Sequence, residues 1–108
     1  NWSVRPTDLL DQSPRMKPLI KEAESRLNHK NVSEKCFFRV EYQTLTRLKE
    51  SNGILFTILT EQVPIIGLEK SQQLNLFGVL KSCPEKTIKY KGISNFYDLL
   101  CKDLEKRI

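Results

Sequence analysis

A row of charged and amide side chains between residues 39 and 43 could do chemistry. The segment reads RVEYQ, so Arg39, Glu41 and Gln43 alternate with Val40 and Tyr42. Successive side chains of a β-strand point to opposite faces, and these three polar groups would therefore share one face. Facing an enclosed pocket, Glu41 could hold or deprotonate a polar substrate while Arg39 and Gln43 orient it. Facing water, the same row would be the solvated side of a half-covered sheet.

The row belongs to the first of two strand-like runs. Residues 37–48 alternate polar and apolar side chains, whereas residues 54–60 read ILFTILT and are almost continuously apolar or β-branched. Ser51, Asn52 and Gly53 lie between the runs and tolerate the positive φ that a hairpin turn needs. We therefore predict an antiparallel hairpin. The apolar second run is typical of a central strand that is covered on both sides.

The rest of the chain predicts a short strand and three helices around this hairpin. Residues 1–4 are typical of the end of a strand, and a polar loop precedes the hairpin. Apolar residues recur at helical spacing in residues 19–27 and 68–80, and a last helix is expected to start at a cap on Ser94 or Asn95. At 108 residues, the chain is expected to form one α+β domain over residues 1–108.

Composition and charge exclude several functional classes. The net charge is +5, but basic and acidic residues are interleaved in KEAESR, RLKE and KDLEKR, as on solvated helix faces. A nucleic-acid surface would cluster its positive charge, so this class is disfavoured. No apolar run approaches the roughly 20 residues that span a bilayer, and we expect no membrane insertion.

The cysteines and the single histidine predict no metal or nucleophilic site. Cys36, Cys83 and Cys101 are far apart in the sequence and form no CxxC motif or disulfide framework. They indicate a reducing intracellular compartment, with Cys36 and Cys101 buried as small hydrophobic side chains. His29 is expected in an exposed loop and has no partners for zinc binding or for a catalytic triad.

The predicted hairpin also implies a partner. Two strands alone are marginally stable in water, and an apolar strand exposes unpaired backbone groups along any free edge. We therefore expect another chain, or an upstream segment outside residues 1–108, to complete the sheet.

Three motifs resemble the C-terminal part of the haem-dependent oxidative N-demethylases, which include dimethylamine monooxygenase haem subunits. They are the opening NWS, the run RVEYQTLTRL followed by ILFTI after a short turn, and Tyr90-Lys91-Gly92. In that family the corresponding segments resemble R-x-NWS, RVERQTLRRLP-x-SG-x-ILFTIRTY and a YKG-like element. The resemblance implies part of a PAS-like antiparallel sheet with flanking helices, and it implies that residues 1–108 correspond to the end of a larger haem domain.

The resemblance also implies an activity and its cofactor. The family's proteins hold a b-type haem, activate oxygen and remove a methyl group from a small secondary amine, with electrons from a flavin and iron–sulfur reductase. The haem ligand that the resemblance implies is a histidine in an upstream IHxPVP-like segment, which no residue here matches. Glu41 matches the glutamate of RVERQTL and is the implied catalytic residue, since a carboxylate can pair with an amine and accept its proton. Arg39, Gln43 and Thr44 match positions that support or flank it.

Several positions depart from the family pattern. Tyr42, Lys49, Leu59 and Glu61 stand where the family has arginine, proline, arginine and tyrosine. A second hypothesis therefore stays open, in which the chain is a degenerate PAS-like subunit without haem. It would then act as a structural or interaction component of a larger protein assembly.

Overall fold

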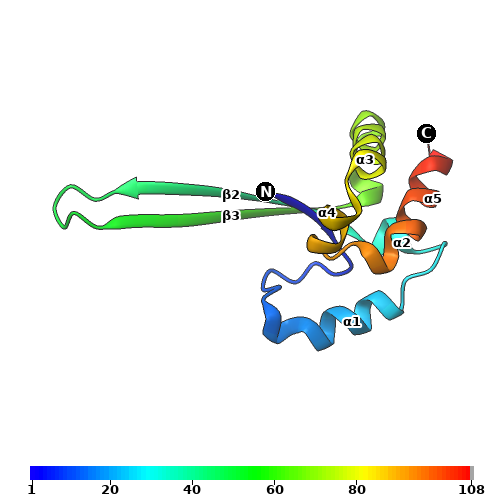
Figure 1. The fold of residues 1–108 in the computed structure, drawn as a ribbon, viewed down its shortest axis with the longest axis horizontal. Coiled ribbons are helices and arrows are strands. Elements are labelled where there is room, and N and C mark those ends of the chain that lie inside the picture. The colour runs from blue at the N-terminus through cyan, green and yellow to red at the C-terminus, as the bar shows by residue number, and fades with distance from the viewer. Residues whose placement is uncertain (108) are drawn as a thin grey trace.

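The computed structural model describes residues 1–107 as a three-stranded antiparallel sheet with helices gathered at one end (Figure 1). The strands are β1 (Trp2–Arg5), β2 (Phe37–Arg47) and β3 (Ile54–Pro64), and β2 lies in the middle. This arrangement confirms the predicted α+β class.

Five α-helices are described. They are α1 (Lys17–Ser25), α2 (Val32–Lys35), α3 (Lys70–Ser82), α4 (Glu85–Tyr90) and α5 (Tyr97–Arg107), with short 3-10 turns at Pro14–Met16, Ile65–Gly67 and Ser94–Phe96. The helices predicted from periodicity are confirmed as α1, α3 and α5. The short helices α2 and α4 were not predicted, and each is held by a single buried aliphatic side chain, Val32 and Ile88. In the described part of the chain, none of the helices has the length and hydropathy of a membrane span.

The predicted hairpin is confirmed. β2 and β3 pair antiparallel without interruption from Phe37 opposite Pro64 to Arg47 opposite Ile54. The turn places Asn52 at φ 58°, a left-handed conformation that asparagine adopts more readily than most residues. The side chain of Asn52 also accepts a hydrogen bond from Nε of Arg47 at 3.2 Å, which closes the end of the hairpin.

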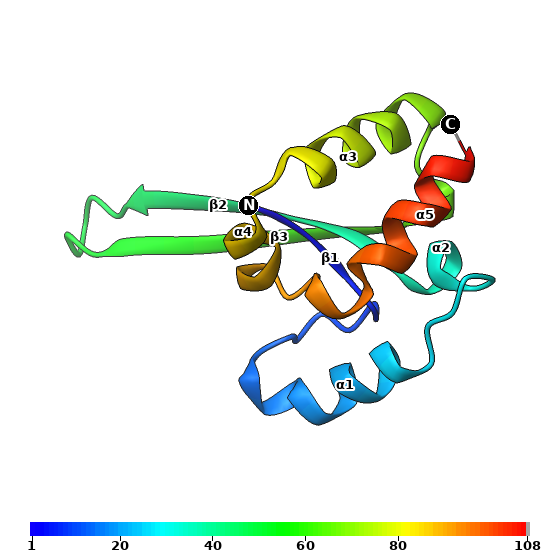
Figure 2. The ribbon, with the colours of Figure 1, turned by 45° about the vertical axis from the view of Figure 1, so that its right-hand side comes forward.

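The hydrophobic core lies where the base of the sheet meets the helices, and Figure 2 shows the helical end from the side. Val4 from β1 and Ile65, the first residue of the turn after β3, are buried there against side chains of α2, α3, α4 and α5. The largest side chain of this core is Phe96 from the turn before α5, which is 2 % exposed. The helices thus fix the base of the sheet, while the outer part of the hairpin extends beyond them.

One expectation about the second run is wrong. Residues 54–60 were expected to form a central strand covered on both faces, but β3 is an edge strand. Ile54 is 71 % exposed, Phe56 and Ile58 are each 53 % exposed, and Leu59 is 60 % exposed. An apolar sequence indicates that other protein must cover the strand. It does not indicate whether the covering residues belong to this part of the chain.

Candidate functional site

Arg39 fastens the loop that follows β1 to one face of the sheet. Its side chain is 10 % exposed. Nη1 and Nη2 donate hydrogen bonds to the carbonyl oxygens of Leu9 and Leu10 at 3.0 and 2.8 Å. Nη1 also donates to Oε1 of Gln62, 3.2 Å away on β3. A guanidinium has five donors in a plane, so one buried arginine holds Leu9 and Leu10 over the sheet and reaches β3 as well.

Glu41 lies beside Arg39 on the same face of β2. Its Oε1 is 3.4 Å from both Nε and Nη2 of Arg39, and its side chain is 27 % exposed. The backbone of Glu41 is fixed by β1, because its amide donates to the carbonyl of Asn1 at 2.8 Å. Among residues 1–107, no donor hydrogen-bonds to Oε2. Glu41 therefore has one carboxylate oxygen oriented by Arg39 and one that can accept a proton or an N–H group.

A pocket of about 350 Å³ opens where β1, β2 and the loop meet. Its lining residues are Asn1, Trp2, Ser3, Arg5, Gln12, Ser13, Arg39 and Glu41. Two guanidinium groups and one carboxylate face this space, so its local field is positive. A cationic ligand would not be drawn in by that field, and the contribution of Glu41 is confined to short-range hydrogen bonding.

Arg5 closes one side of this pocket. Its Nε donates to Oε1 of Gln12 at 2.7 Å, which ties the loop to β1. Burial lowers the pKa of the Arg5 guanidinium; the carboxylate of Glu24 opposes this shift, and the charge of Arg39 adds to it. The wall of the pocket is therefore built from groups that also hold the local fold together.

Lys91 joins the opening NWS motif to the later YKG motif, although about 90 residues separate them. Its Nζ donates to the carbonyl of Trp2 at 2.6 Å and lies 4.4 Å from the centroid of the indole ring, a cation–π distance. The carbonyl of Lys91 accepts hydrogen bonds from Oγ of Ser3 and Nη1 of Arg5 at 3.2 and 3.3 Å. The two motifs of the family resemblance thus form one contact that positions β1.

Gly92 makes this contact possible. It has φ +73°, and a Cβ built at this position would lie 2.4 Å from Nη1 of Arg5. The amide of Gly92 donates to the carbonyl of Lys89, and the amide of Ile93 donates to that of Ile88, so the left-handed residue also ends α4. The positive φ favours glycine at this position, and a Cβ would in addition displace the end of the Arg5 side chain.

Gln43 and Thr44 lie further out on β2, and the structure does not bring them to the Arg39–Glu41 pocket. Both are exposed, and Oγ1 of Thr44 contacts Oγ1 of Thr57 on β3. Gln43 shares the face of Glu41, whereas Thr44 belongs to the opposite face. Their supporting role stays a prediction that depends on what covers the hairpin.

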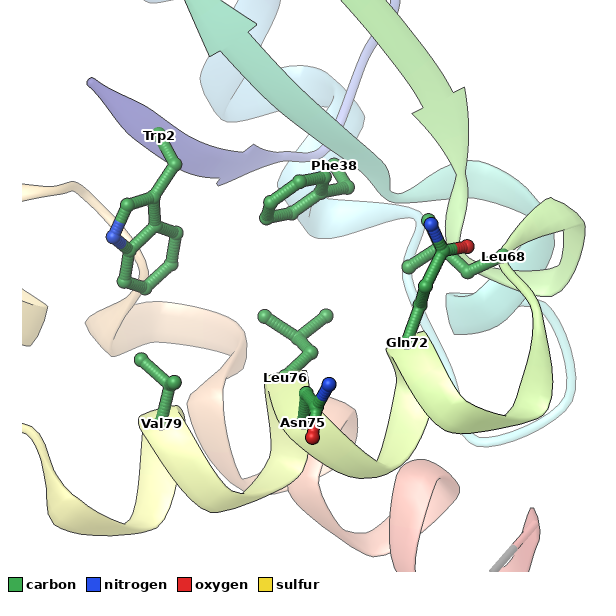
Figure 3. A pocket seen from close by; sticks show the side chains of 7 residues that line it. All are labelled: Trp2, Phe38, Leu68, Gln72, Asn75, Leu76 and Val79. Carbon is green, nitrogen blue, oxygen red and sulfur yellow. The ribbon is translucent and has the colours of Figure 1, made fainter.

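A second pocket lies on the other face of the sheet, between its base and α3 (Figure 3). It measures about 290 Å³ and is lined by Trp2, Phe38, Leu68, Gln72, Asn75, Leu76 and Val79. The rings of Trp2 and Phe38 stack with their centroids 6.2 Å apart. The two amides stand at its rim on the exposed side of α3. This pocket offers apolar contact but no acid or base.

The two buried thiols described in residues 1–107 do not suit a haem iron or another metal. Cys36 and Cys101 are buried, and burial raises the pKa of both thiols, that of Cys36 to about 12. A thiolate ligand would require the opposite shift. His29 is exposed in a loop, as predicted, and no cluster of three or more metal-ligating side chains occurs within the described residues.

Sequence reasoning found the strand that carries the pocket but missed most of its lining. Arg5 ends β1, Gln12 and Ser13 come from the loop after it, and only the tertiary fold brings them to Glu41. The one available signal was the pair of short motifs, NWS and YKG, whose contact through Lys91 fixes the position of β1.

Comparison with protein families gives one match over nearly the whole chain. The sequence model of the family described as haem-dependent oxidative N-demethylase, alpha subunit-like, matches residues 1–101. The matched range contains the Arg39–Glu41 pocket, the hairpin and the contact made by Lys91.

Proposed function

Since the chain belongs to the haem-dependent oxidative N-demethylase, alpha subunit-like family, we propose that residues 1–108 supply one wall of the substrate pocket of such an amine monooxygenase. The chain would correspond to the C-terminal portion of a larger PAS-like haem domain. The observation that carries this proposal is that the Arg39–Glu41 row lines a walled pocket instead of lying bare in solvent.

In this proposal Glu41 orients the substrate. Its Oε2 accepts an N–H from a small secondary amine, while Arg39 holds Oε1 and so fixes the plane of the carboxylate. Because Arg5 and Arg39 make the pocket positive, a neutral amine is a better fit than its ammonium form. A secondary ammonium that enters the pocket would give its N–H proton to Glu41, which leaves the neutral amine in place.

Oxygen activation is assigned to residues outside those described. In this family haem supplies the oxidising chemistry, and no group of three or more metal-ligating side chains is found in residues 1–107. The b-type haem would be held by the upstream histidine that the resemblance implies, and electrons would come from a flavin and iron–sulfur reductase. The family description names an alpha subunit, which agrees with an assembly of several chains.

Replacing Glu41 by glutamine in the complete assembly tests the role of this residue. Glu41→Gln keeps the shape of the side chain and removes its capacity to accept a proton, so amine-dependent turnover should fall by roughly 100-fold or more. The haem absorption spectrum should stay unchanged. Glu61→Gln is the matched control, because Glu61 is exposed and lies on the opposite face of the same sheet. Full activity of Glu41→Gln would remove the catalytic assignment.

The alternative is a degenerate subunit without haem that acts as a structural or interaction component. The exposed apolar hairpin favours this second function, because it offers a large surface to another chain. A visible absorption spectrum of the native assembly separates the two. A Soret band supports the enzyme, and its absence together with retained assembly supports the structural role.

A further inference from the structure

The outer edge of β3 carries unpaired backbone groups over its whole exposed length. The amide of Leu48 donates to the carbonyl of Gly53 at 2.8 Å. Hydrogen-bonded pairs alternate along an antiparallel ladder, so Leu55, Thr57 and Leu59 direct their backbone groups to β2. The N–H and C=O groups of Ile54, Phe56, Ile58 and Thr60 must then point to the outer edge. In both ribbon views the outer part of the hairpin extends past the helices (Figures 1 and 2).

This edge lacks the features by which proteins protect free strands. Residues 54–60 contain no charge, no proline and no glycine, and β3 shows no interruption of its register against β2. Natural edge strands are normally blocked by lysine, proline or a bulge. A seven-residue run of this kind is prone to pair with another strand.

The same run is complementary to itself. When two copies pair antiparallel about a two-fold axis at Thr57, Ile54 lies opposite Thr60 of the second copy and Phe56 opposite Ile58. Thr57 then lies opposite Thr57, and Leu55 opposite Leu59. Aromatic–β-branched and Thr–Thr pairs are favourable across antiparallel strands. No charges meet within the run, and Glu61 at its end falls opposite Gly53.

We propose that β3 pairs with β3 of a second copy of this chain, centred on Thr57, to form a continuous sheet across a two-fold dimer. Four hydrogen-bonded residue pairs satisfy the free groups of both edges. A slip must be by an even number of residues to keep the outward-pointing groups opposite one another, and a slip by two in either direction moves the uncharged runs out of full overlap. The inference does not depend on haem binding or on the role of Glu41.

Charge substitution at the two-fold axis tests the proposal. Light scattering on the 108-residue chain should give twice the 12.6 kDa mass of one chain. Thr57→Lys and Thr57→Glu each bring like charges together and should weaken the dimer by about tenfold or more. An equimolar mixture of the two variants should restore it. Thr46→Lys and Thr46→Glu are the controls, since Thr46 faces the same side from β2 and lies away from the edge.

Cysteine cross-linking tests the register separately. In the proposed pairing the two copies of residue 57 form a non-hydrogen-bonded pair, with Cα atoms about 4.5 Å apart, which a disulfide can join. Thr57→Cys in a Cys83→Ser background should therefore oxidise to a covalent dimer. Leu55→Cys should not, because its two copies would lie about 14 Å apart along the strands.

Several outcomes would overturn the proposal. A monomeric native chain at tens of micromolar would do so, as would equal cross-linking of the two cysteine variants. Failure of the mixed charge variants to associate would also contradict it, provided that circular dichroism shows both to be folded. A polydisperse aggregate unaffected by Thr57→Lys would show that the hairpin associates through its faces instead of its edge.

Discussion

Arg39 lines the pocket beside Glu41 and also holds the local fold. Three of its hydrogen bonds hold Leu9, Leu10 and Gln62, and only its longer contacts reach Glu41. Removing Arg39 would take away the donor to the carbonyl of Leu10 and leave the carbonyl of Leu9 to Gln12 alone, and this would loosen the loop as well as the carboxylate. Loss of activity on substituting Arg39 would therefore say little about catalysis, whereas Glu41 can be changed with less structural effect.

Substituting Gly92 and Gly78 by alanine tests whether the backbone conformation at Gly92 needs glycine, with Gly78 as the control. Gly92→Ala should destabilise the protein by about 1–3 kcal/mol, because alanine is strained at φ +73° and its Cβ would displace Arg5. Gly78→Ala should stabilise it by about 0.5–1 kcal/mol, because Gly78 is inside α3 and a Cβ there meets nothing within 4 Å. Urea unfolding followed by circular dichroism measures both. Equal effects of the two changes would contradict the role given to Gly92.

Among the elements, the hairpin divides into a supported base and an unsupported outer part. Thr44 to Arg47 and their partners in β3 have exposed side chains, and only the ladder between the two strands orders them. Backbone hydrogen bonds with little buried surface around them open at low free-energy cost.

Hydrogen exchange should therefore separate the two parts of the hairpin in the monomeric Thr57→Lys variant. The amides of residues 44–47 should exchange much faster than those of α5, whose Leu100 and Leu104 are fully buried. In the dimer, the amides of Ile54, Phe56 and Ile58 should gain protection. Uniform protection along the hairpin of the variant would show that its outer part is covered within one chain.

The elements also show what the sequence could and could not predict. Alternation in residues 37–48 and the turn at Ser51 to Gly53 predicted β2, β3 and their pairing, because these signals are local. α2 and α4 were missed, since VSEK and EKTIKY carry almost no periodicity and depend on burial of Val32 and Ile88. Glu41 was identified by its motif, but the loop residues that wall its pocket are brought there by contacts with no local signal.

The whole molecule is elongated because the hairpin extends from a small helical body. Its extents are 54 × 32 × 26 Å, and the radius of gyration of its Cα atoms is 15.9 Å. A compact chain of this length would have a radius of gyration of about 13 Å.

Small-angle scattering on the monomeric Thr57→Lys variant tests this shape. The radius of gyration should lie well above that of a compact chain, close to the value from the structure plus the hydration layer. A value near about 13 Å would mean that the hairpin folds back on the helices in solution. The native dimer should give a larger value than the variant, because edge pairing leaves the two helical bodies apart.

The contact between Lys91 and Trp2 has a consequence for the order of folding. β2 and β3 are neighbours in the sequence, and a local hairpin can form within microseconds. β1 must instead wait for β2, about 40 residues away, and for Lys91, about 90 residues away, so its docking closes the longest loops in the chain. During synthesis β1 leaves the ribosome before β2 and Lys91, and its docking waits for both. Until β1 docks, the apolar hairpin is formed but the helical core beside it is incomplete. Chaperones therefore have their longest opportunity to bind the exposed side chains of the hairpin in this interval.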